Sequence, residues 1–174
     1  MDTPYIFLNL QVGQKVVKGE ATERFFEGQI AIDEVGWELA CDHQPVQDQK
    51  GVRKDPTLIQ PKRLTLQKAF DRSTVNLCDY MAKRLLFDTA TITMVKSLAW
   101  EEKPRPHIEI TLTKGYVESV NLVASEGNLS VAIKEKVTLS FSAIKILYYS
   151  NVASSLSTGA PATTFQLEMP SEIQ

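Results

Sequence analysis

Apolar and polar residues alternate along most of this chain, beginning with the segment at residues 5–12. The side chains in one phase of that segment are all aliphatic: Ile6, Leu8, Leu10 and Val12. A period of two places alternate side chains on opposite faces, so the segment is predicted to be a β-strand with one buried face. The same pattern predicts further short strands at residues 63–70, 89–96, 107–114 and 116–124.

Two segments change the phase of this alternation half-way along. In residues 28–40 the two sets are Ile30 and Ile32, then Val35, Trp37 and Leu39. The step from Ile32 to Val35 is three residues, and in a regular strand an odd number would turn one of the two sets towards water. A bulge or bend is therefore expected at Asp33–Glu34. Residues 136–149 repeat the change. Strands that change phase are required at the corners of barrels and orthogonal sandwiches, so the pattern favours a closed or nearly closed antiparallel sheet.

One segment in the middle of the chain has a helical period instead. Its apolar stripe falls at i, i+3, i+4, i+7 and i+11, at Thr74, Leu77, Cys78, Met81 and Leu85. This spacing predicts an amphipathic helix over about residues 74–86. Asp71 or Ser73 is the expected N-cap, because a side-chain oxygen there accepts a hydrogen bond from an unpaired backbone N–H.

Two further segments have little periodicity. Residues 41–62 contain Gly51 and three prolines and are expected to form an extended loop, which in a compact domain is usually functional or disordered. Residues 151–174 are rich in Ser, Thr and Ala and are expected to be a mobile tail, although the alternation of Phe165, Leu167 and Met169 is compatible with a late strand. The expected organisation is one domain over residues 1–150, followed by this tail.

Composition excludes several functional classes. The 174 residues fit one domain, and 19 basic against 21 acidic residues give a net charge of −2, which offers no footprint for nucleic acid or an anionic membrane. No apolar run approaches the length of a membrane-spanning helix. The first ten residues lack the basic region of a secretory signal, so we expect synthesis in the cytoplasm and no membrane insertion.

The few candidate catalytic residues do not form a recognisable set. Cys41 and Cys78 are expected to be reduced, buried thiols. Cys78 lies on the apolar stripe past the first helical turn, which favours packing over nucleophilic chemistry, and no pattern places His107 beside it. Cys41 and His43 supply at most half of a zinc site. We therefore predict no catalytic residue, no metal and no cofactor, and a protein that is not an enzyme.

Four stretches, taken in order, carry a resemblance to a known family. They are VKGEAT at residues 17–22, IAIDEVGWELA at 30–40, LTLQKAFDRSTVNL at 64–77, and IEITLTKGYVESV at 108–120 followed by EKVTLSFSAIKILYY at 135–149. Together they resemble the hemolysin-coregulated protein (Hcp) family, the tube protein of bacterial type VI secretion systems, over residues 5 to 149. The chain departs from the family pattern at Val75, where Pro is frequent, at Lys114, where Asp is common, and in its longer tail.

The resemblance implies a mainly β fold, an antiparallel β-barrel of two sheets with one flanking α-helix. It also implies a homohexameric ring. Such rings stack into an inner tube that a contractile sheath propels, with a spike protein at the tip and effector cargo in the lumen. Secretion would then follow a route that needs no signal peptide.

The resemblance also suggests a role for the extended loop at residues 41–62. It corresponds in position to an extended loop of the family that resembles a stacking contact between rings. The residues expected to include ring-stacking contacts are His43, Gln47, Asp48, Lys50 and Arg53. The alternative is a solvated, flexible loop.

Three other functions remain open from the sequence. The first is the tube of a related contractile machine, such as a phage-like tail or an extracellular injection particle. The second is a monomeric β-sandwich that binds a glycan or another ligand. The third is an enzyme that uses Cys78 or the Cys41–His43 pair.

Overall fold

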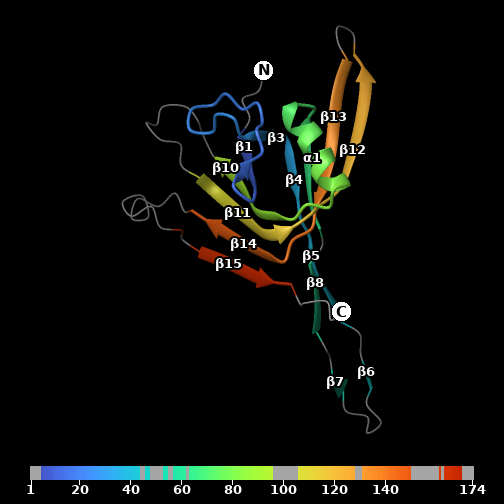
Figure 1. Cartoon of the computed structure of the whole chain (residues 1–174). Helices are drawn as coiled ribbons and strands as arrows, with labels where there is room; N and C mark the ends of the chain where they lie inside the picture. Colours follow the sequence, from blue (N-terminus) through green and yellow to red (C-terminus); the bar gives the residue numbers. More distant parts are fainter. Residues whose placement is uncertain are drawn as a thin grey trace.

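The computed structural model describes residues 5–43, 46–47, 53–54, 57–61, 63–95, 106–127, 131–149, 161 and 163–169. Two antiparallel sheets enclose a common core and one helix flanks them (Figure 1). Sheet A has the order β15-β14-β11-β10-β1-β2, with β3 also paired to β1, and sheet B has the order β12-β13-β9-β4. No strand pair joins the two sheets among the described strands, so hydrogen bonds do not close the barrel.

The strands of the two sheets have the following bounds. Sheet A contains β1 (Ile6–Val12), β2 (Lys15–Val16), β3 (Ile30–Ile32), β10 (Phe87–Val95), β11 (Pro106–Gly115), β14 (Ala143–Tyr148) and β15 (Thr163–Glu168). Sheet B contains β4 (Glu34–Gly36), β9 (Leu64–Ala69), β12 (Val117–Glu126) and β13 (Val131–Leu139).

The changes of hydrophobic phase mark the points where the chain passes from one sheet to the other. β3 pairs with β1 in sheet A and β4 pairs with β9 in sheet B, with only Asp33 between them. The predicted bend at Asp33–Glu34 is therefore confirmed. The second change of phase falls between β13 and β14, which also lie in different sheets. Two further crossings join β9 to β10 through α1, and β11 to β12.

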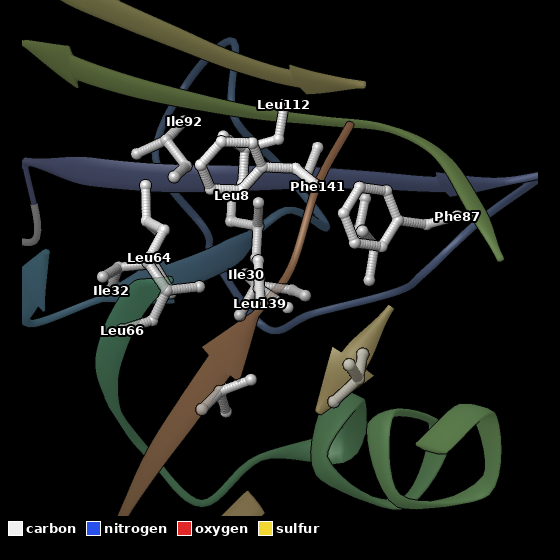
Figure 2. Packing of buried hydrophobic residues seen from close by; sticks show 14 of the residues in the cluster. Leu8, Ile30, Ile32, Leu64, Leu66, Phe87, Ile92, Leu112, Leu139 and Phe141 are labelled. Carbon is white, nitrogen blue, oxygen red and sulfur yellow. The ribbon is translucent and has the colours of Figure 1, made fainter. Parts of the chain in front are cut away.

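The corner between β11 and β12 depends on Gly115. A Cβ atom added there would collide with the carbonyl oxygen of Ser140 and would lie 2.6 Å from the ring of Phe87. Only a residue without a side chain allows the two segments to approach this closely. The ring of Phe87 belongs to the main core, which Figure 2 shows between the two sheets.

The core contains apolar side chains from both sheets and from the helix. Figure 2 labels ten of them: Leu8, Ile30, Ile32, Leu64, Leu66, Phe87, Ile92, Leu112, Leu139 and Phe141. In β1 the predicted face is the buried one, since Leu8 and Leu10 are at most 1% exposed. Phe7, on the other face, is also fully buried, because its ring stacks on Phe26 of the following loop at 4.2 Å.

The helix α1 (Arg72–Ala82) confirms the predicted helix but lies slightly earlier than residues 74–86. Asp71 is the N-cap and forms a capping box with Thr74. The helix ends at Lys83, and Arg84 then adopts a φ of +50°, which a continuing helix excludes. Leu85 consequently leaves the stripe and is 38% exposed, whereas Leu77 is buried.

Two segments expected to lack regular structure contain strands. In the first, β5 (Leu39–His43) pairs with β8 (Thr57–Pro61), and β6 (Val46–Gln47) pairs with β7 (Arg53–Lys54). The expectation was wrong for these residues, which form a long hairpin that projects away from both sheets (Figure 1). In the second, β15 adds to the edge of sheet A beside β14, which is the late strand that the alternation of Phe165 and Leu167 allowed. The mobility expected of the tail stays a prediction, because residues 151–160 and 170–174 lie outside the described residues.

Candidate assembly surfaces

The residues predicted to stack rings belong to the projecting hairpin. His43 ends β5 and lies opposite Thr57 in the register. Gln47 of β6 lies directly opposite Arg53 of β7, so the structure brings these two positions together. Asp48 and Lys50 fall outside the described residues. The hairpin has the projecting shape that a contact with another molecule needs, and the stacking role itself stays a prediction.

The residues considered for catalysis are distributed over separate elements. Both cysteines were expected to be buried. Cys78 is half-buried on α1, and Cys41 is exposed on β5, so neither is fully buried. His107, at the start of β11, packs its ring edge-on against Tyr148 at 5.3 Å. Within the described part of the chain, no group of three or more His, Cys, Asp or Glu residues is arranged to hold a metal ion. The same part contains no helix that is long and apolar enough to cross a membrane.

A buried charged cluster at the beginning of α1 escaped the sequence analysis. The Lys68 side chain of β9 is 1% exposed, and its Nζ donates a hydrogen bond of 2.7 Å to Oδ1 of the N-cap Asp71. Nζ also lies 2.7 Å from Oε1 of Glu135 on β13, an ion pair without hydrogen-bond geometry. Thr74 donates to the other Glu135 oxygen at 2.6 Å. A buried charge is tolerated when it is paired and hydrogen-bonded in this way.

This cluster holds the beginning of α1 against sheet B. Each charged side chain reaches a partner on a different element, so the N-terminus of α1 is held against β9 and β13 together. The signal was present in the sequence: Lys68 follows Leu64 and Leu66 in the buried phase of its strand, and Glu135 precedes Val137 and Leu139 in the same way. Charged residues in a buried phase indicate a mutual pair.

The order of the elements, and the one helix among the described residues, agree with the resemblance to the Hcp family. A comparison with family models tests independently whether the chain belongs to it. A family model described as "Type VI secretion system effector, Hcp" matches residues 7–148. This chain belongs to the Hcp family. The match begins in β1 and ends at the last residue of β14, so it covers α1 and every described strand of the two sheets except β15. A direct comparison with curated proteins gave no match.

Solved Hcp structures share this fold at low sequence identity. A mutant of Hcp1 from E. coli EAEC 042 superposes with a TM-score of 0.68 at 16% identity, covering 95% of this chain and 99% of that chain. Hcp1 from Salmonella typhimurium gives a TM-score of 0.61 at 20% identity, with 93% and 92% covered. The predicted fold class, two antiparallel sheets with one helix, is thereby confirmed.

The fold also occurs in a protein that terminates a tube. The tube-terminating cap of the anti-feeding prophage matches with a TM-score of 0.53 at 11% identity, covering 85% of this chain and 91% of that chain. At this identity the likeness concerns the fold alone.

Proposed function

We propose that this Hcp protein is the tube subunit of a type VI secretion system. Six copies form a ring, and rings stack into the inner tube that a contractile sheath propels, with a spike protein at the tip and effectors in the lumen. The protein is made in the cytoplasm and leaves the cell by a route that needs no signal peptide. The observation that carries the proposal is the family match, which covers α1 and both sheets except β15.

The size of the chain is compatible with such a ring. A compact chain of 174 residues has a radius of gyration of roughly 16 Å and a diameter of about 40 Å. Six equal spheres in a ring enclose a hole as wide as one of them, so the lumen would admit a small folded domain. A head-to-tail contact between copies closes such a ring and leaves both of its faces free to stack.

The projecting hairpin is separate from the two-sheet body, so ring stacking can be tested without disturbing the formation of the ring. Its strands β5 to β8 lie outside both sheets, so its outer part can be removed without touching the core (Figure 1). Deleting Val46 to Asp55 leaves three residues to join His43 and Thr57, which already lie opposite each other. A hairpin loop of three residues is among the common ones, and Pro56→Gly in the same variant supplies the left-handed residue that such a loop needs. We expect this variant to form hexamers but no tubes.

Negative-stain imaging and a secretion assay would test this expectation. A second variant, in which a Gly/Ser segment of equal length replaces Val46 to Asp55, separates the effect of the side chains from the effect of length. It keeps the length of the hairpin and removes its side chains. Specific stacking contacts predict that both variants lose tubes and secretion while keeping hexamers. Normal tubes and normal secretion by the deletion variant would contradict the role of the hairpin.

The tube of a phage-tail-like or extracellular contractile particle is the second candidate. The fold shared with the anti-feeding prophage cap favours it. The two functions differ in the machinery that moves the tube. Secretion that stops when the type VI sheath gene of the producing cell is removed supports the first, whereas release of complete sheathed particles into the medium supports the second.

Enzymatic, nucleic-acid and membrane functions have no part in this proposal. A clean monomer at high protein concentration in sedimentation would contradict both tube functions and would favour the monomeric ligand-binding alternative. Alanine at Cys78 that abolished an activity without changing stability would contradict the absence of catalysis.

A further inference from the structure

The projecting hairpin is connected to the body through a break in the strand pairing. β4 pairs with β9 up to Gly36, and β5 begins to pair with β8 at Leu39. Trp37 and Glu38, here called the joint, connect β4 to β5. Because β5 and β8 form a sheet of their own, the hydrogen bonds of sheet B do not determine the direction of the hairpin.

The length of the hairpin makes its direction important. β5 has five residues, and a strand advances by about 3.4 Å per residue, so β6 and β7 lie beyond roughly 17 Å of strand. These outer strands contain Gln47 and Arg53, which are predicted to take part in ring stacking. A small rotation at the joint therefore moves the predicted contact residues by a large distance.

Trp37 of the joint packs against the late strand β15. Its side chain is partly buried against the main core, and its ring lies 6.3 Å from the ring of Phe165 at an angle of 49°. Aromatic rings at this separation and tilt attract each other. Phe165 belongs to β15, which ends near the base of the hairpin in Figure 1.

β15 is itself fixed firmly enough to support the joint. It pairs with β14 along its whole length, and the Met169 N–H donates a further hydrogen bond of 2.7 Å to the Ser142 carbonyl. Phe165 lies opposite Ile146, so the two side chains share one face of sheet A. Leu167 lies on the same face and packs against the main core.

The contact between Trp37 and Phe165 connects the edges of the two sheets. Among the described strands, β15 is an edge of sheet A and β4 is an edge of sheet B. No described strand pair joins these sheets, so side chains have to hold the edges together. Since Trp37 directly follows β4, one aromatic contact connects the edges at the point where the hairpin leaves the body.

The returning strand of the hairpin has a weaker support. Arg63, which directly precedes β9, forms an ion pair with Glu118 of β12, and these side chains are 57% and 34% exposed. Ion pairs at exposed positions contribute little, because water and salt screen the charges. The aromatic contact is therefore the stronger of the two.

We propose that β15 is a positioning element for the projecting hairpin, with Phe165 and Trp37 as the positioning residues. Phe165 holds the indole, and the indole fixes the direction in which β5 leaves the body. The outer strands β6 and β7 are thereby presented in the orientation that ring stacking needs. The link to stacking rests on the proposed tube function, whereas the contact itself lies within a single chain.

The direction of the hairpin can be measured with two spin labels. Gln47→Cys places one label on β6, and Lys136→Cys places the other on an exposed position of β13. The native Cys41 and Cys78 are replaced by serine in this chain. Pulsed electron paramagnetic resonance then gives the distribution of distances between hairpin and body, and an excess of unlabelled chain removes distances between different copies.

Three substitutions in β15 test the positioning role. Phe165→Ala should widen the distance distribution about twofold or more, and Phe165→Tyr should restore the original width because it keeps the ring. Gln166→Ala is the matched control, since Gln166 is exposed on the other face of the same strand and its loss should leave the width unchanged. An unchanged width in Phe165→Ala, or an equal widening in Gln166→Ala, would overturn the proposal.

Tube assembly tests the link to stacking. Phe165→Ala should form rings at the same protein concentration as the unsubstituted chain, as measured by sedimentation velocity. Its concentration for half-maximal tube formation, measured by negative-stain imaging, should rise about tenfold or more, because a hairpin of variable direction has to be ordered at each contact. Phe165→Tyr and Gln166→Ala should form tubes normally.

The outcomes separate the positioning role from the tube function. Normal tube formation by Phe165→Ala, together with a widened distance distribution, would overturn the role of β15 in stacking. An unsubstituted chain that forms no rings would overturn the tube function. The distance distributions would then still decide whether β15 fixes the hairpin, since they are measured within one chain.

Discussion

Buried polar side chains at the beginning of α1 combine charges from three parts of the chain. Lys68 and Glu135 are 1% and 2% exposed, and Asp71 completes the set as the helix N-cap. Removing one partner of a buried ion pair leaves the other charge without compensation, which costs more than the pair contributes. The cluster therefore determines where the helix starts more than it adds net stability.

At the residue scale, Lys68→Met should lower the free energy of unfolding by about 3–5 kcal/mol, because it leaves the Glu135 carboxylate buried and unpaired. The double variant Lys68→Met/Glu135→Leu should recover a large part of this loss. Lys83→Met is the matched control, since it breaks an i,i+4 pair with Asp79 whose side chains are 62% and 46% exposed, and it should cost about 0.5 kcal/mol or less.

Urea denaturation of the three variants and of the Glu135→Leu single variant would measure the coupling, under conditions where the chain is monomeric. Additive effects of the Lys68 and Glu135 substitutions would contradict a direct pair. Individual residues of this kind were the least predictable part of the molecule. Hydrophobic patterning contained a signal that Lys68 lies on a buried face, but only the folded structure shows that Glu135, far away in the sequence, lies beside it.

At the scale of elements, β15 extends sheet A beyond β14. It lies beyond the residues matched by the family and pairs along the whole of β14. Phe165 of β15 lies 6.3 Å from the ring of Trp37 and opposite Ile146. The strand thus covers the edge of sheet A and joins a tail residue to an aromatic side chain of the body.

Truncating the chain after Ala160 should keep the fold and lower the free energy of unfolding by about 2–3 kcal/mol, since the partly buried Leu167 and the packing of the 40% exposed Phe165 are lost. Trp37 fluorescence, followed in a Trp100→Phe chain, should change because Phe165 no longer packs beside the indole. Thr164→Ala is the control on the exposed side of the strand and should alter stability by less than about 0.5 kcal/mol. An unchanged unfolding midpoint after truncation would show that β15 does not stabilise the body.

Elements with long periodic patterns were predictable, and the short ones were not. The strand at β1 and the bend at Asp33 follow from side-chain period alone. The two-residue strands β6 and β7 contain too few positions for any period to be detected, so the projecting hairpin had the pattern of a loop. The end of α1 depended on the backbone of Arg84, which the apolar stripe does not encode.

At the scale of the whole molecule, the two sheets share one core without a hydrogen-bonded seam between them. The chain passes between the sheets four times, at β3–β4, at β9–β10 through α1, at β11–β12 and at β13–β14. Neither sheet can bury its apolar face without the other, so their stabilities are linked. The sequence predicted this arrangement from its changes of phase, but it could not reveal which strands form the edges.

We therefore expect the monomeric chain to unfold in one cooperative transition. Far-UV circular dichroism, which reports both sheets, and the fluorescence of Trp37 in a Trp100→Phe chain should give the same midpoint in urea. Midpoints that differ beyond the error of the fits would show that the sheets unfold separately. Gly115→Ala should lower both midpoints together, because the corner that it disturbs belongs to both sheets.

The projecting hairpin leaves and re-enters the body at neighbouring positions. β5 follows β4 and β8 precedes β9, and β4 and β9 are themselves paired. The hairpin can therefore be lengthened or shortened without moving any strand of the body. If the hairpin stacks the rings of the proposed tube, a change in its length would alter the spacing between rings without altering the two-sheet body that forms each ring.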